Sequence, residues 1–279
     1  MSICVVVKVG EGVVLATDSA VSVLGGPLGP EGPVGPPGVI KVFLAGRKLL
    51  QIGELPVGVV TWGSGSLRNR TIASFVEEFE NAEKIRKLTP ANLEIDKIAD
   101  DLWKFLLKKS DTYFAQVPRQ SRPKTGVVVC GYSKQEFFPE GYGMVVPVDK
   151  PYRIRPDRDG NPNFGASWYG MTDAIIRFHY GRDPKIFAIL KSHGIEDNAI
   201  QKIKEEIDRS VQYRVLFEAM PLGDAIEYAR FLVELTIERF RFVAGAEICG
   251  GKITLATITR KGGFEQLSLS RTKTKKEGF

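Results

Sequence analysis

Residues 2–18 read SICVVVKVGEGVVLATD, and this stretch indicates the fold class more clearly than any other part of the chain. Two runs rich in β-branched residues, 3–9 and 13–17, flank the sequence Gly10-Glu11-Gly12. β-Branched residues favour strands, and glycines supply the positive φ angles that tight hairpin turns require. The stretch therefore predicts that the chain opens with two antiparallel strands.

The rest of the chain alternates between blocks of strands and blocks of helices. Short apolar runs predict further strands at residues 48–52, 57–62, 126–131, 141–148, 253–259 and 264–270. Apolar residues at helical spacing predict helices at residues 66–82, 93–110, 172–180, 184–191, 197–209 and 222–242. Because the alternation is coarse, the order favours a layered α+β domain over a doubly wound parallel sheet.

The composition is that of an ordinary globular protein. The 279 residues are 43% hydrophobic and 26% charged, and they contain no apolar run long enough to span a bilayer. The first residues lack the basic start and the cleavage site of a secretory signal, which predicts residence in the cytoplasm. Because no Gly-rich linker or break in composition divides the chain, we expect residues 1–279 to form a single domain.

Two segments depart from this average composition. Residues 25–38 are rich in glycine and proline and contain the sequence GPLGPEGPVGPPG. Proline favours polyproline II, and long insertions in surface loops cost little closure entropy, so we expect an extended, exposed insertion between strands. Residues 271–279 begin with RTKTKK, and this basic tail is predicted to be a solvated C-terminus.

The residue types argue against several functional classes. The net charge is +6, but basic residues outside the tail are dispersed among acidic ones, so we expect no nucleic-acid binding. Cys4, Cys130 and Cys249 are widely separated and odd in number, which indicates neither a disulfide framework nor a cysteine metal site. His179 and His193 lack a cysteine partner at zinc-site spacing. No phosphate-binding loop is present. We therefore expect neither a metal nor a cofactor.

Four landmarks occur in an order that resembles the proteasome β-subunit family of N-terminal nucleophile (Ntn) hydrolases. They are residues 2–18, GRKLLQI at 46–52, WGSG at 62–65 and GGKI at 250–253. The resemblance implies a four-layer αββα sandwich, a peptide or protein substrate, and a homo-oligomer that could be a ring. It specifies no ATPase partner. A catalytically inactive ring subunit with the same fold is an alternative, as is a hydrolase or transferase acting on a small amide.

The resemblance also implies roles for particular residues. Ser2 matches the nucleophile once Met1 is removed, Asp18 the acid, Lys48 the lysine and Gly63 the donor of an oxyanion N–H. A serine hydroxyl needs a nearby base, and the α-amino group of the same residue can serve, with a reference pKa of about 7.7–8.0. Lys48 would favour the neutral amine and the developing alkoxide, and Asp18 would hold Lys48.

Some positions are ambiguous or depart from the family pattern. Lys41 has a context similar to that of Lys48, but Lys48 precedes Gly63 by a separation closer to that of the family. Thr172 matches a family serine near the nucleophile and keeps its hydroxyl.

The family usually has threonine at the position of Ser2. The supporting acid falls at Ala246 or Glu247, and the serine before Gly-Gly is replaced by Cys249. The supporting network therefore differs from that of the family, which favours the inactive alternative.

Overall fold

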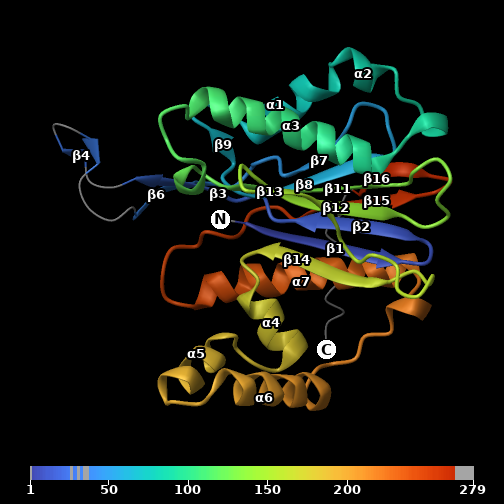
Figure 1. The fold of residues 1–279 in the computed structure, drawn as a ribbon. Helices are drawn as coiled ribbons and strands as arrows, with labels where there is room; N and C mark the ends of the chain where they lie inside the picture. Colours follow the sequence, from blue (N-terminus) through green and yellow to red (C-terminus); the bar gives the residue numbers. More distant parts are fainter. Residues whose placement is uncertain (1, 26–27, 30–31, 34–37, 268–279) are drawn as a thin grey trace, which may run out of the picture.

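The protein is a mixed α/β molecule built around two five-stranded antiparallel sheets (Figure 1). A computed structural model describes residues 2–25, 28–29, 32–33 and 38–267. The first sheet has the order β14-β1-β2-β15-β16 and comprises β14 (Gly165–Gly170), β1 (Ile3–Val9), β2 (Gly12–Thr17), β15 (Thr254–Thr259) and β16 (Gly263–Leu267). The second has the order β13-β12-β11-β8-β7 and comprises β13 (Asp149–Arg153), β12 (Glu140–Val146), β11 (Thr125–Gly131), β8 (Val57–Gly63) and β7 (Leu49–Gln51).

Helices cover the outer face of each sheet (Figure 1). They are α1 (Ile72–Glu80), α2 (Glu83–Arg86), α3 (Ile95–Tyr113), α4 (Asp173–Tyr180), α5 (Lys185–Ser192), α6 (Asp197–Ser210) and α7 (Leu222–Phe242), with single 3₁₀ turns at Pro90–Asn92, Arg119–Ser121 and Phe217–Ala219. Helix α3 packs on β11, β12 and β13 of the second sheet, and α7 packs on β1 and β2 of the first. Helices α5 and α6 lie beyond α4, away from the sheets.

Strand β1 is buried on both of its faces, which explains why its sequence is almost uniformly apolar. Ile3, Val5, Val7 and Val9 belong to the hydrophobic cluster shared with α7. Cys4 and Val6 belong to a different cluster, which lies between the two sheets. Because successive side chains point to opposite faces of a strand, a strand covered on both faces shows no polar alternation.

The predicted opening hairpin is confirmed, but its glycines act differently from the expectation. Neither Gly10 nor Gly12 has a positive φ. Instead, a Cβ at Gly12 would lie 2.7 Å from the carbonyl oxygen of Ile258 in the neighbouring strand β15. Gly12 is therefore required for close approach of two backbones, not for the turn conformation.

Alanine substitutions at these two glycines should separate the two explanations. We expect Gly12→Ala to lower the free energy of unfolding by about 1–3 kcal/mol, because backbone must move. Gly10→Ala is the matched control, since its added Cβ would meet only Phe164, at 4.0 Å, and should change stability by less than about 1 kcal/mol. Urea unfolding measures both, and equal effects would contradict the close-approach explanation.

Three local predictions need correction. The helix predicted at 66–82 begins only at Ile72, because β9 (Ser66–Leu67) and β10 (Arg70–Thr71) pair as a short ribbon. Thr71 then caps the helix by accepting a hydrogen bond from the Ser74 N–H. Strands β13 and β14 were not anticipated, since their sequences, DKPYR and GASWYG, lack a strand-like apolar run.

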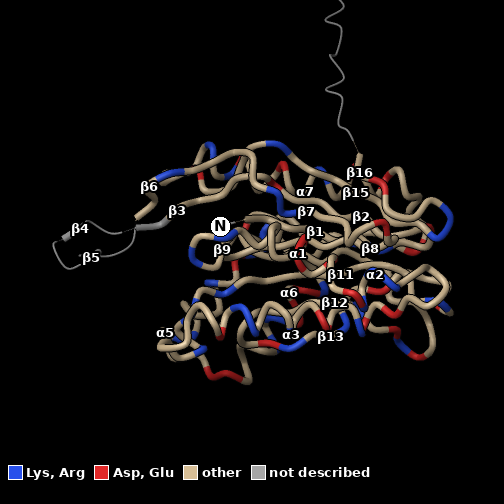
Figure 2. The backbone as a smooth tube through the Cα atoms, turned by 90° about the horizontal axis from the view of Figure 1, so that it is seen from above, with Lys and Arg blue, Asp and Glu red and all other residues tan. Residues whose placement is uncertain are grey.

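An antiparallel ribbon projects from the body of the molecule and includes the described residues of the Gly/Pro-rich segment (Figures 1 and 2). Strands β3 (Val21–Gly25) and β6 (Gly38–Phe43) form the ribbon, and β4 (Leu28–Gly29) pairs with β5 (Gly32–Pro33) toward its tip. The remaining residues of the predicted 25–38 insertion lie outside the described residues, as does the basic tail at 271–279.

Charges are spread over the surface in both signs, as Figure 2 shows for the Lys, Arg, Asp and Glu positions. Among the described helices, none combines the length and the apolar character that crossing a membrane would require.

Candidate active site

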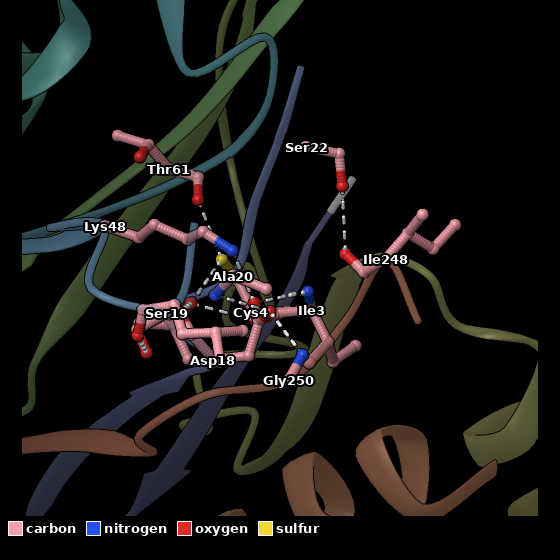
Figure 3. Close-up of polar contacts among 12 residues, drawn as sticks. Ile3, Cys4, Asp18, Ser19, Ala20, Ser22, Lys48, Thr61, Ile248 and Gly250 are labelled. Carbon is pink, nitrogen blue, oxygen red and sulfur yellow. Dashed lines mark hydrogen bonds and ion pairs between the residues drawn. The ribbon is translucent and has the colours of Figure 1, made fainter. Parts of the chain in front are cut away.

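A buried carboxylate organises the candidate site (Figure 3). Asp18 follows β2 directly and is fully buried. Its Oδ1 atom accepts a hydrogen bond from the Ile3 N–H (3.1 Å) and lies 2.7 Å from the Lys48 ammonium. Its Oδ2 atom accepts from the N–H groups of Ala20 (3.2 Å) and Gly250 (3.1 Å). Each carboxylate oxygen thus has two donors, which satisfies the buried charge.

Lys48 reaches Asp18 from the other sheet. It immediately precedes β7, its side chain is buried, and its carbonyl oxygen accepts a hydrogen bond from Thr61 of β8 (2.9 Å). The ion pair therefore links the end of a strand in the first sheet to the start of a strand in the second. A buried pair of this kind holds both side chains in one geometry.

Ser2 lies just before β1 and is 4% exposed. Its carbonyl oxygen accepts a hydrogen bond from the Met171 N–H (2.8 Å), and the next residue, Ile3, pairs with Gly170 of β14. Gly170 has a φ of 92°, and a Cβ there would overlap the Ser2 carbonyl oxygen. The backbone of Ser2 is therefore fixed by contacts that only glycine at position 170 permits.

A cleft of about 450 Å³ brings the candidate residues to one surface. Ser2, Lys48 and Gly63 all line it. Gly63, the last residue of β8, has a φ of 81° and lies close to the carbonyl oxygen of Lys124. The walls include apolar side chains of the projecting ribbon (Val21, Val23 and Phe43) and of the start of α1 (Ile72 and Ala73), as well as an exposed ion pair between Arg47 and Glu77.

The structure does not bring two other predicted residues into this cleft. Lys41 is exposed on β6, opposite Val23 of the ribbon, so Lys48 and not Lys41 is the lysine that contacts Asp18. Thr172 is half-buried, precedes α4 and makes no side-chain hydrogen bond to the helix N-terminus. It is one residue beyond Met171, which binds the Ser2 carbonyl.

Two buried thiols lie next to the ion pair. The Cys4 Sγ donates to the Thr61 carbonyl oxygen (3.1 Å), and burial raises the pKa of this thiol to about 12. Burial and then the negative charge of Asp18 raise the pKa of the Cys249 thiol above its ordinary value. Because the thiolate is the nucleophilic form of cysteine, the raised pKa values make both thiols poor nucleophiles at neutral pH. Glu247, two residues earlier, is exposed.

Ser19 is a structural residue of the site that the sequence reasoning missed. Its hydroxyl donates to the Leu44 carbonyl oxygen (2.6 Å) and accepts from the Lys252 N–H (2.7 Å). Its own carbonyl oxygen accepts from the Gly46 N–H (2.8 Å). Gly251, with a φ of 79°, would place a Cβ 2.5 Å from the Ser19 hydroxyl. These bonds tie together the segments that carry Asp18, Lys48 and the Gly-Gly turn.

No group of three or more His, Cys, Asp or Glu side chains that could hold a metal ion occurs within residues 2–25, 28–29, 32–33 and 38–267. The charged side chains on the cleft are Lys48, which is paired with Asp18, and the exposed pair of Arg47 and Glu77. No protein-family model matches the chain, and no curated protein matches it either.

Proposed function

We propose that the chain is a proteasome-like Ntn hydrolase that cleaves peptide bonds with Ser2 after Met1 has been removed. The observation that carries this proposal is that Ser2, Lys48 and Gly63 line the same cleft, and that the buried Asp18 binds the Lys48 ammonium. The two sheets with helices outside them support the proposal of a four-layer αββα sandwich of the Ntn type.

The proposed first step forms an acyl-enzyme. The Ser2 Oγ attacks the carbonyl carbon of the scissile amide while its proton passes to the free α-amine of the same residue. The amine then gives this proton to the leaving nitrogen, the C–N bond breaks, and Ser2 is left as an ester. In the second step the amine takes a proton from water as its oxygen attacks the ester carbon. The C–O bond to Ser2 then breaks, the amine returns the proton to the Ser2 Oγ, and the acid product leaves the free enzyme.

The neighbouring groups assist by electrostatics. Lys48 places a buried positive charge on the cleft, which favours the neutral amine and the alkoxide that develops on Ser2. Asp18 compensates this charge and fixes its position. The Gly63 N–H, without a side chain to obstruct it, would donate to the oxyanion, an effect typically worth about 3–4 kcal/mol of barrier.

The proposed substrate is a peptide or protein, of which a short segment would occupy the cleft of about 450 Å³. The proposal includes assembly into a homo-oligomer, with a ring as one form of it, and residence in the cytoplasm. The position of Glu247 favours the second candidate, an inactive structural subunit with the same fold, since the acid expected there is exposed.

An electrophilic peptide, such as a peptide epoxyketone, tests the proposed function. We expect it to form one covalent adduct located at Ser2, and we expect Ser2→Ala to form none. Lys48→Met should slow labelling strongly, because the buried charge on the cleft is lost. Lys41→Met is the matched control and should label like the wild type, since Lys41 is exposed on the ribbon. Equal labelling of wild type and Ser2→Ala would show that a different residue reacts.

A further inference from the structure

A second cavity, of about 390 Å³, lies on the outer side of the first sheet and shares no lining residue with the Ser2 cleft. It is formed by Trp168 of β14, by His179 and Tyr180 at the end of α4, and by the end of α6 and the segment that follows it. Its volume lies within the roughly 300–1,000 Å³ range of small-molecule sites.

The charge of this cavity is positive. Arg155, Arg209 and Arg214 line it. The lining contains one carboxylate, Asp208, which is already paired with Arg182 (2.6 Å) and with Lys204 (3.4 Å). Neither Arg209 nor Arg214 forms an ion pair with any carboxylate in the part of the chain that the structure describes. An anion entering the cavity would therefore meet guanidinium groups that have no competing partner.

Two residues that line the cavity, His179 and Arg155, each have a buried nitrogen donor without a partner within the described ranges. His179 is 6% exposed, and the Gln212 amide nitrogen lies 3.0 Å from its Nε2. Because an amide nitrogen can only donate, this bond assigns the proton of the neutral ring to Nδ1. Among the described residues, neither that Nδ1 nor the Nε of Arg155 has a hydrogen-bond partner. Burial and then the charge of Arg155 lower the pKa of His179, which favours the neutral ring.

Aromatic rings make up much of the remaining lining. The centroid of the Trp168 ring lies 5.1 Å from that of the His179 ring and 6.2 Å from that of the Tyr180 ring, and both pairs are edge to face. Tyr213 and Phe217 contribute two further rings. Rings of this kind provide apolar surface for a planar group, which a bare inorganic anion would leave unused.

We propose that this cavity binds a small aromatic oxyanion, that is, a planar ring carrying a phosphate or carboxylate group. The arginines attract the oxyanion, the unpartnered donors of His179 and Arg155 hydrogen-bond to it, and the aromatic rings pack against its planar group. This site is separate from the Ser2 cleft, so the proposal does not depend on catalysis by Ser2.

The chain contains two histidines, which makes NMR titration of the imidazoles a direct test. An oxyanion beside His179 favours the imidazolium, so phenyl phosphate should raise the pKa of His179 by about 1 or more. His193 is exposed, lies outside the cavity lining, and serves as the internal control. No change at His179, or an equal change at both histidines, would overturn the proposal.

Four small molecules test the aromatic and the anionic parts of the proposal separately: phenyl phosphate, benzoate, inorganic phosphate and phenol. We expect phenyl phosphate or benzoate to bind at least tenfold more tightly than inorganic phosphate and than phenol, and the better of the two identifies the oxyanion. Binding of inorganic phosphate with equal affinity would contradict the aromatic part of the proposal. Binding of phenol with equal affinity would contradict the anionic part.

Charge reversal provides the matched variants. Arg209→Glu/Arg214→Glu should weaken binding of the tighter aromatic anion at least tenfold. Arg86→Glu/Lys108→Glu makes the same change in net charge at exposed positions on α2 and α3, and it should bind like the wild type. Equal weakening in both doubles would show a general charge effect and overturn the site. The titration of His179 in the wild type stands independently of how well any variant folds.

Discussion

Asp18→Asn is expected to lower the free energy of unfolding by about 3–5 kcal/mol, because removal of one partner leaves a buried charge uncompensated. Both oxygens of Asp18 accept hydrogen bonds, and Lys48 is buried beside it. An asparagine keeps the shape but has a single acceptor oxygen, so its amide group would also face N–H donors. Urea unfolding measures the loss, and a change below about 1 kcal/mol would contradict the account of this ion pair.

A double-mutant cycle separates the charge from the shape. Lys48→Met removes the charge and keeps a long side chain, and it leaves Asp18 with the backbone donors of Ile3, Ala20 and Gly250. We expect Asp18→Asn/Lys48→Met to be less destabilised than the sum of the single variants, because neither charge is then buried alone. Additive losses would show that the two side chains are not coupled. Labelling at Ser2 should be strongly reduced in all three variants.

Gly170→Ala is expected to lower the free energy of unfolding by about 2–6 kcal/mol. The new Cβ would overlap the Ser2 carbonyl oxygen, and the φ of 92° is unfavourable for alanine. Since that carbonyl is held by the Met171 N–H, the substitution should displace Ser2 and reduce its labelling as well.

Gly160→Ala is a control that separates the cost of placing alanine at positive φ from the cost of the contact with Ser2. Gly160 has a φ of 76°, but a Cβ there would meet nothing within 4 Å. It should cost only about 1–2 kcal/mol and leave labelling at Ser2 unchanged. Similar stability losses at positions 160 and 170 would mean that contact with Ser2 contributes nothing.

Strands covered on both faces were the most predictable part of the fold. The predicted strands at 3–9, 126–131 and 253–259 correspond to β1, β11 and β15, because continuous burial gives continuous apolar sequence. Strand β14 was not predicted because its sequence, GASWYG, reflects contacts with distant residues. Its first and last glycines have positive φ, and Gly170 packs against Ser2. Such constraints arise between distant segments and produce no periodic pattern of apolar residues in the local sequence.

The candidate site also contains residues that the sequence indicated and one that it did not. Ser2, Asp18, Lys48 and Gly63 could be named from the order of the landmarks in the sequence, and three of them line one cleft while Asp18 binds Lys48. The role of Ser19 could not be foreseen, because its partners at Leu44, Gly46 and Lys252 are backbone groups brought together only by folding. The one local signal was its position directly after Asp18.

The proposed catalysis requires that Ser2 becomes the N-terminal residue and acts through its own amine. Intact-mass measurement of the protein purified from cells, combined with sequencing of the N-terminal peptide, tests this requirement. We expect a chain one methionine residue lighter than the full sequence, with a free α-amine on Ser2. A protein that keeps Met1, or whose Ser2 amine is acetylated, would contradict the proposed function.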